Sequence, residues 1–265
     1  MRRVADESPI PPEWAAYLDE MAPRGHVAVD RTAALILGVD TYSWLERDQP
    51  LVPETAVIGD RRASRMADLA AHSRDLAPVE VVRIHGVPTT TPLRTAMDLG
   101  CVLKRWQAFA AMNALAGAYD LAAADFVREL PRHRRRRGVC QLRALIGHLT
   151  PEVESMRESR LLLAILDAGL PVPRAQHRVD LPGGEWFRVD FAYPHRRIAV
   201  EYDGSEFHDS TEEQRRRDRR RRDLMRQDGW EFIVVTSADF RGRREGVWLT
   251  QLRDLLAATH HNRRW

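Results

Sequence analysis

Hydrophobic and polar positions alternate most clearly in two short segments, residues 187–192 and 198–203. Alternation with a period of two predicts a strand whose two faces differ. The polar connection at residues 194–196 is short enough for a hairpin. These segments therefore predict two adjacent antiparallel strands near the middle of the C-terminal half.

This hairpin has a chemical consequence. Residues directly opposite each other in an antiparallel pair share a face. If the apolar residues of both strands lie on one face, Asp190, Glu201 and Asp203 lie together on the other. Register is well specified, because a slip of one residue would mix the two sets. Three neighbouring carboxylates repel each other, so we expect a hard cation or a counter-charge among them.

The remaining patterns of the C-terminal half place this hairpin in a larger unit. Helical spacing predicts helices before and after it, and two further short apolar runs predict strands. The resulting order is α-β-β-β-α-β with a last helix, a mixed sheet flanked by helices in an α/β (α+β) fold. The predicted elements are the helix 152–168, the strand 175–181, the hairpin, the helix 211–228, the strand 230–236 and the helix 246–258.

The N-terminal half predicts a mixed, mostly helical domain. Residues 1–12 are polar and proline-rich, and helical spacing follows at 13–21 and 30–37, with Asp30 as N-cap. These two helices are either ordinary packing or a helix-turn-helix. Strands are predicted at 55–58 and 79–84, and helices after residue 92, at 105–117 and at 122–130. A break at residues 150–151 divides the chain into domains 1–150 and 151–259 and a tail, 260–265.

Composition limits the class of protein. The 265 residues are 44% hydrophobic and 30% charged, which is typical of a globular domain in water. No apolar run approaches the roughly 20 residues that span a membrane, and the N-terminus does not resemble a signal peptide. The two cysteines form no CxxC motif and are expected to be inert. We therefore expect a cytoplasmic protein without a membrane partner.

Charge is informative through its distribution. The net charge is only +3, and Lys104 is the only lysine, so nearly all positive charge is arginine. A GC-rich genome, whose codons favour arginine, would by itself explain many such runs. The run 132–137 is either a phosphate-contacting loop, with Arg134, Arg135 and Arg136 as candidates, or the solvated start of a helix. The run 215–222 pairs with itself at i,i+4 and also forms a basic ridge beside the predicted carboxylates.

The C-terminal half resembles the restriction-endonuclease-like, or PD-(D/E)xK, superfamily. More narrowly, it is similar to the Vsr-like group of bacterial endonuclease domains. The matching stretches are SMRESRL at 155–161, RVDFAYP at 188–194, VEYDG at 200–204, His208, and residues 218–230. The resemblance implies metal-dependent hydrolysis of DNA phosphodiesters, with Mg²⁺ or Mn²⁺ as the cofactor. A hard cation of this kind prefers oxygen ligands and activates both water and phosphate.

Carried over by position, the resemblance implies that Asp190 and Glu201 hold the metal and that Glu158 completes or orients the site. One position departs from the superfamily pattern, because Asp203 stands where a lysine usually follows the glutamate. Asp203 would act as a general base or a further metal ligand. His208 is a candidate for proton transfer or metal binding, or else it is structural.

Nucleic-acid contacts are expected from the same half of the chain. The candidates are arginines of the first hairpin strand and of the helix that follows the hairpin. Arginine stays protonated, so it can stabilise phosphate charge but cannot act as a base. The residues are Arg188, Arg215, Arg219 and Arg222.

The N-terminal half carries a second resemblance. The segment 82–99, VRIHGVPTTTPLRTAMDL, is similar to AbiEi-type antitoxins. That family belongs to abortive-infection toxin–antitoxin systems, and its members typically bind DNA and repress their own operon. Its full-length members begin with a winged helix, for which this chain has little room before His26.

The leading hypothesis is a metal-dependent DNA endonuclease that acts in phage defence or DNA repair. The alternative is a non-catalytic, DNA-binding regulator of the antitoxin type with an inactive nuclease fold. A third reading is a protein that neutralises a toxin without touching DNA. The expected partner is DNA, with a cognate toxin or a second copy of the chain as further candidates.

Overall fold

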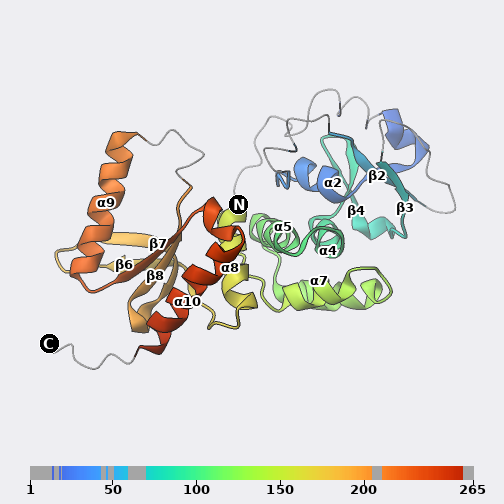
Figure 1. Ribbon diagram of the computed structural model, residues 1–265. Coiled ribbons are helices and arrows are strands. Elements are labelled where there is room, and N and C mark those ends of the chain that lie inside the picture. Colours follow the sequence, from blue (N-terminus) through green and yellow to red (C-terminus); the bar gives the residue numbers. More distant parts are fainter. Residues whose placement is uncertain are drawn as a thin grey trace. The chain divides into compact units, whose positions relative to one another are not determined.

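The computed structural model describes residues 14, 18, 20–42, 46, 51–58, 70–204 and 211–258, with backbone alone at 71, 73 and 215. The chain divides into two compact units, Met1–Pro151 and Glu152–Trp265. Helices and mixed sheets occur together, which confirms the predicted α/β class (Figure 1). No helix within the described ranges combines the length and apolar character needed to cross a membrane.

The first unit contains a five-stranded mixed sheet in the order β3-β2-β1-β5-β4. Pairs β1–β2 and β4–β5 are antiparallel, whereas β1–β5 and β2–β3 are parallel. The sequence predicted only two of these strands, β2 and β4, because segments of three or four residues are too short to show a clear periodicity. The strands are β1 (His26–Ala28), β2 (Glu54–Val57), β3 (Ala70–Ser73), β4 (Val81–Ile84) and β5 (Val87–Thr90).

Helices pack with this sheet in the same unit. Strand β1 lies between the first two predicted helices, so the helix-turn-helix alternative is wrong. Asp30 is the first residue of α2 and not its N-cap, which is Val29, because the Asp30 carboxylate is bound by Arg74. The elements are η1 (Ala22–Arg24), α2 (Asp30–Ile36), η2 (Pro78–Glu80), α4 (Pro92–Val102), α5 (Arg105–Ala118), α6 (Ala123–Glu129), η3 (Leu130–His133) and α7 (Val139–Ile146).

A buried ion network centres on Asp98 of α4, whose side chain is 0% exposed. Its carboxylate accepts hydrogen bonds from Arg94 at 3.0 Å, from Arg74 at 2.8 Å and from Arg136. His133 Nε2 lies 3.4 Å away. Burial alone would raise the pKa of Asp98, but the contact with His133 and the three arginine charges outweigh it and hold the pKa at about 2.

Several residues of the segment 82–99, which resembles AbiEi antitoxins, take part in this network or in the cap of α4. Thr91 caps α4 through its hydroxyl, which accepts a hydrogen bond from the Arg94 backbone at 3.3 Å. The Arg94 guanidinium also donates to Glu80 at 2.9 Å, and Arg132 reaches the other Glu80 oxygen at 3.1 Å. Two charged residues of this segment, Arg94 and Asp98, are therefore part of the buried network of the unit.

The second unit has the predicted order of elements. Its sheet has the order β6-β7-β8-β9, with β6, β7 and β8 antiparallel and β9 parallel to β8 (Figure 1). Helix α9 connects the two parallel strands. The elements are α8 (Met156–Asp167), β6 (Arg174–Asp180), β7 (Trp186–Tyr193), η4 (Pro194–Arg196), β8 (Ile198–Tyr202), α9 (Glu212–Gln227), β9 (Glu231–Val235), η6 (Ser237–Phe240) and α10 (Arg243–Ala257).

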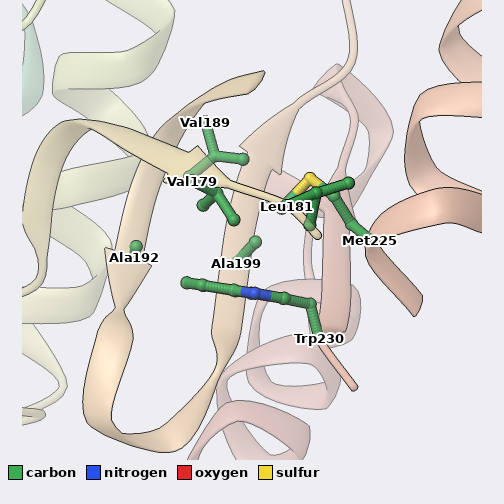
Figure 2. Packing of buried hydrophobic residues seen from close by; sticks show 7 residues of the cluster. All are labelled: Val179, Leu181, Val189, Ala192, Ala199, Met225 and Trp230. Atoms are coloured by element: carbon green, nitrogen blue, oxygen red, sulfur yellow. The ribbon is translucent and has the colours of Figure 1, made fainter. Parts of the chain in front are cut away.

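The hairpin has the expected register, and the core of this unit fixes the orientation of α9. Phe191 pairs with Val200, as the alternation predicted. Met225 of α9 is completely buried in a cluster with strand residues and Trp230 (Figure 2). Burial of apolar surface at Met225 sets the rotation of α9 about its axis, so residues three and four positions earlier lie on the same side of the helix. Those residues are Arg221 and Arg222.

Candidate functional site

Three of the four predicted carboxylates, Asp190, Glu201 and Asp203, line one cavity of about 500 Å³ in the second unit. Phe191 pairs with Val200, so the next position in the register places Asp190 opposite Glu201. Asp203 follows β8, and its backbone N–H donates to Val235 at 2.8 Å, which extends the ladder to β9. Residues of α9 complete the lining: Gln214, Arg217, Asp218, Arg221 and Arg222.

Glu201 is held by two arginines. Its side chain is 4% exposed, and its Oε1 lies 2.8 Å from Nη1 of Arg221. The other oxygen, Oε2, accepts hydrogen bonds from Arg221 Nη2 at 3.0 Å and from Arg222 Nε at 3.2 Å. Hydrogen bonds between ionised partners are stronger than neutral ones, and the arginine fork matches a carboxylate. Arg221 and Arg222 therefore provide, for Glu201, the counter-charge that we expected from the sequence.

Asp190 has a different environment. Its Oδ2 accepts a hydrogen bond from the Tyr202 backbone at 2.8 Å. Burial raises the pKa of Asp190 to about 7, and the charges of Glu158 and Glu201 add to this effect against the Tyr202 hydrogen bond and Arg221. A carboxyl group that titrates near neutral pH can donate or accept a proton during a reaction.

Glu158 lies in the first turn of α8, outside the cavity lining, and its charge acts on Asp190. Ser155 caps this helix, accepting a hydrogen bond from the Glu158 backbone at 3.1 Å. The Glu158 carboxylate accepts from Gln176 at 2.8 Å and from the Glu154 backbone at 3.1 Å. Gln176 was not among the predicted residues, yet it lies opposite Asp190 in the β6–β7 register and has a left-handed φ of 48°. Non-glycine residues with this backbone strain cluster at functional sites.

Asp203, in the position of the usual lysine, lies at the mouth of the site. Its side chain is 30% exposed, and Oδ2 is 3.8 Å from Nη2 of Arg222. A carboxylate at this distance shares the charge of Arg222 with Glu201. Arg222 therefore lies near two acids, and one of them, Asp203, stands where the superfamily pattern would place a lysine.

The other candidates of this unit are distributed outside the cavity lining. Arg188 forms a two-pronged pair with Glu154, at 2.9 and 2.8 Å. Arg219 donates to Glu212 at 3.0 Å and not to the acid expected at i,i+4. The side chain of Arg215 and all of His208 lie outside the described residues, so their predicted roles stay predictions.

The arginine run of the first unit is split between two environments. Arg134 and Arg135 are exposed, whereas Arg136 binds the buried Asp98. A residue held by a buried carboxylate has a structural role, and it is less available to phosphate. This leaves Arg134 and Arg135 as the exposed members of the predicted triplet.

Arg221 is a further residue of the candidate site that the sequence reasoning missed. The signal was present, because Arg221 and Arg222 lie four and three positions before the apolar Met225. Residues at these spacings share a face of a helix. Within the arginine run, the sequence spacing from the buried Met225 distinguishes the arginines that face the sheet from those that face solvent.

The resemblance implies a divalent metal ion at these carboxylates. Their oxygen atoms are the donors that Mg²⁺ prefers. Arg221 and Arg222, however, occupy both oxygens of Glu201, and Glu158 is bound by Gln176. Within the described ranges, no group of three His, Cys, Asp or Glu side chains lies where it could hold a metal ion. In this arrangement the residues do not fit a bound cation.

Comparison with known proteins places the chain in a family. It is 31% identical over 220 residues to Rv2248 and to MT2308, uncharacterized proteins of Mycobacterium tuberculosis strains ATCC 25618 / H37Rv and CDC 1551 / Oshkosh. The match covers 82% of this chain and 77% of each relative. The chain belongs to the Rv2248 family. Because 220 residues exceed the length of either unit, the Rv2248 match includes residues of both. No protein-family model matches the chain, and no solved structure matches it significantly.

Proposed function

We propose that this member of the Rv2248 family is a metal-dependent DNA endonuclease, with its reaction centre in the second unit. One observation carries the proposal: Asp190, Glu201 and Asp203 line a single cavity together with arginines of α9. Phosphodiester hydrolysis requires groups that transfer protons and positively charged groups that bind phosphate, and these acids and arginines are of those two kinds.

The chain's own residues divide these tasks. Arg217, Arg221 and Arg222 line the cavity and can bind phosphate oxygens. Asp190, with its pKa of about 7, can take a proton from water or give one to the leaving oxygen. Mg²⁺ or Mn²⁺ stays the expected cofactor. Because the carboxylates do not present a ready site, we assign no step to the cation.

The first unit would target or regulate the second. Its resemblance to AbiEi antitoxins supports DNA binding, and Arg134 and Arg135 are exposed for phosphate contacts. A nuclease of this kind would act in the cytoplasm, in phage defence or DNA repair.

Two observations favour a second candidate function. Both oxygens of Glu201 are engaged by arginines, and an acid replaces the usual lysine. A non-catalytic DNA-binding regulator would need no free carboxylate. In that case the nuclease fold would hold DNA, or a cognate toxin, without cutting.

The test is incubation of the full-length protein with supercoiled and mismatched DNA in Mg²⁺, Mn²⁺ or EDTA. A variant carrying Asp190→Ala and Glu201→Ala runs alongside, with Asp254→Ala, an exposed acid on α10, as the matched control. The proposal expects cleavage that needs the metal, is lost in the double variant and persists in the control. Tight DNA binding without cleavage of any substrate would refute the enzyme and support the regulator. Circular dichroism confirms that the variants are folded.

A further inference from the structure

The segment 132–138, which we call the arginine loop, leads from η3 into α7 and is anchored on its inner side. Arg132 pairs with Glu80 at 3.1 Å, and Arg136 binds the completely buried Asp98. Breaking either contact would leave a buried carboxylate with less compensation for its charge, which is strongly disfavoured. The arginine loop is therefore held in one conformation by the buried network of the first unit.

The end of the arginine loop is also fixed to α4. Gly138 has a left-handed φ of 85°, and a Cβ atom at this position would collide with the Cys101 carbonyl oxygen, so the loop passes directly against α4. Three residues later, Gln141 donates side-chain hydrogen bonds to the carbonyls of Gly100 at 2.9 Å and Leu103 at 3.0 Å. A loop that is ordered in this way loses little conformational entropy when a ligand binds to it.

The outer side of the arginine loop carries three exposed arginines, Arg134, Arg135 and Arg137. None of them forms an ion pair with an acid of the ranges that the structure describes. Neighbouring positive charges repel each other, and an anionic ligand is attracted by all three at once. The loop therefore presents uncompensated positive charge on a rigid support.

Helix α9, which has the longer arginine run, differs in this respect. Seven of its arginines have described side chains, and each has a nitrogen 3.6 Å or less from a carboxylate oxygen. An arginine with a carboxylate partner must give up or share that partner when it binds phosphate, so it adds less affinity. These residues are Arg216, Arg217, Arg219, Arg220, Arg221, Arg222 and Arg226.

We infer that the arginine loop is a preformed binding site for the phosphate backbone of double-stranded DNA, and that its three outer arginines supply more of the electrostatic affinity than the arginine run of α9 does. The inference rests on the proposed function in taking DNA as the partner. Arginine suits phosphate because its planar guanidinium donates two parallel hydrogen bonds to two anionic oxygens. Contacts with the backbone carry no base information, so the loop would hold DNA of any sequence.

The salt dependence of DNA binding measures this division between the two arginine runs. Each neutralised phosphate of B-DNA contributes about 0.9 to the slope of log affinity against log salt concentration, because counterions are released. Replacing Arg134, Arg135 and Arg137 together with glutamine should reduce this slope by about 2–3 and weaken binding about tenfold or more at low salt.

The matched control removes the same number of charges from α9. Arg216, Arg220 and Arg226 are exposed, pair with acids and lie outside the cavity lining. Their joint replacement with glutamine should change the slope by less than about one. Arg132→Gln is a second control, since it removes a charge of the arginine loop that Glu80 already compensates.

The experiment measures binding of the full-length proteins to a short fluorescent duplex by anisotropy, in EDTA and over a range of salt concentrations. Circular dichroism and urea denaturation show that the variants are folded. Unlabelled polyglutamate and unlabelled duplex are compared as competitors at equal charge concentration. If polyglutamate competes as well as the duplex does, the loop attracts anions in general, and its assignment to the DNA backbone is overturned.

The outcomes separate this inference from the proposed function. It is supported if the slope falls in the loop variant and changes little in the α9 variant. Equal reductions in the two variants, or an unchanged slope in the loop variant, would overturn it. The assay contains no free divalent metal, so cleavage is tested independently. Metal-dependent cleavage with an unchanged slope would refute the inference alone, whereas a reduced slope in a protein that cuts no DNA would refute the nuclease alone.

Discussion

Replacing Asp190 by asparagine removes a buried charge and keeps the shape of the side chain. The asparagine oxygen can still accept the hydrogen bond that the Tyr202 backbone donates to Asp190 at 2.8 Å. What changes is the cost of ionisation, because burial together with Glu158 and Glu201 raises the pKa of Asp190 to about 7. We therefore expect Asp190→Asn to stabilise the second unit at alkaline pH.

The magnitude follows from the pKa. In the unfolded chain the pKa of Asp190 is near the ordinary aspartate value of 3.8, and in the folded chain it is about 7. At about 1.36 kcal/mol for each pH unit between them, the ionised form is disfavoured by at most about 4 kcal/mol. The cavity is open to water, which screens part of this cost, so we expect a gain of about 1–3 kcal/mol.

The sign of the pH dependence is fixed by linkage. Between about pH 4 and 7 the folded state binds the proton and the unfolded state has lost it, so wild-type stability falls as pH rises. The stability gained through Asp190→Asn is therefore largest above pH 7 and disappears as the pH approaches 4. For a unit of this size, we expect a Tm increase of about 4–10 °C at pH 8.

Differential scanning calorimetry in EDTA at pH 4.5, 6 and 8 measures this effect. Asp254→Asn, on the exposed face of α10, controls for the loss of any one carboxylate. A gain that is the same at pH 4.5 and pH 8, or no gain at pH 8, would show that Asp190 ionises normally and that the electrostatic account of the site is wrong.

Two further predictions concern the first unit. Asp98→Asn should lower the free energy of unfolding by about 3–5 kcal/mol, because it leaves buried arginines without their carboxylate; a loss below 1 kcal/mol in urea denaturation would contradict the network. Replacing both Arg134 and Arg135 with glutamine should leave the free energy of unfolding unchanged. The number of counterions released on DNA binding should fall by about two, so the affinity should depend less steeply on salt. An unchanged slope in binding titrations from 50 to 200 mM salt would remove this loop from the DNA interface.

The sequence predicted the second unit far better than the first. Its strands have five to eight residues, and the alternation along residues 187–203 is long enough to define both the hairpin and its register. The acids of the cavity followed from that register. Strands β1 and β5 have three and four residues and are buried throughout, so no alternation marked them.

The ion pairs could not be predicted from spacing within one element. Asp30 is a typical N-cap residue by type, but Arg74, 44 positions later, binds its carboxylate. Arg222 was expected to pair along α9, yet it turns to Glu201, 21 positions away. Contacts of this range depend on tertiary packing, which local patterns do not encode.

The buried network of the first unit also has a consequence for synthesis on the ribosome. A nascent chain that has reached the end of α6 carries three acids of the network, Asp30, Glu80 and Asp98, but only two of its arginines, Arg74 and Arg94. The balance changes only when residues 132–136 emerge and supply two more. Because an uncompensated buried carboxylate is strongly disfavoured, this unit should complete its folding only after that loop has left the exit tunnel.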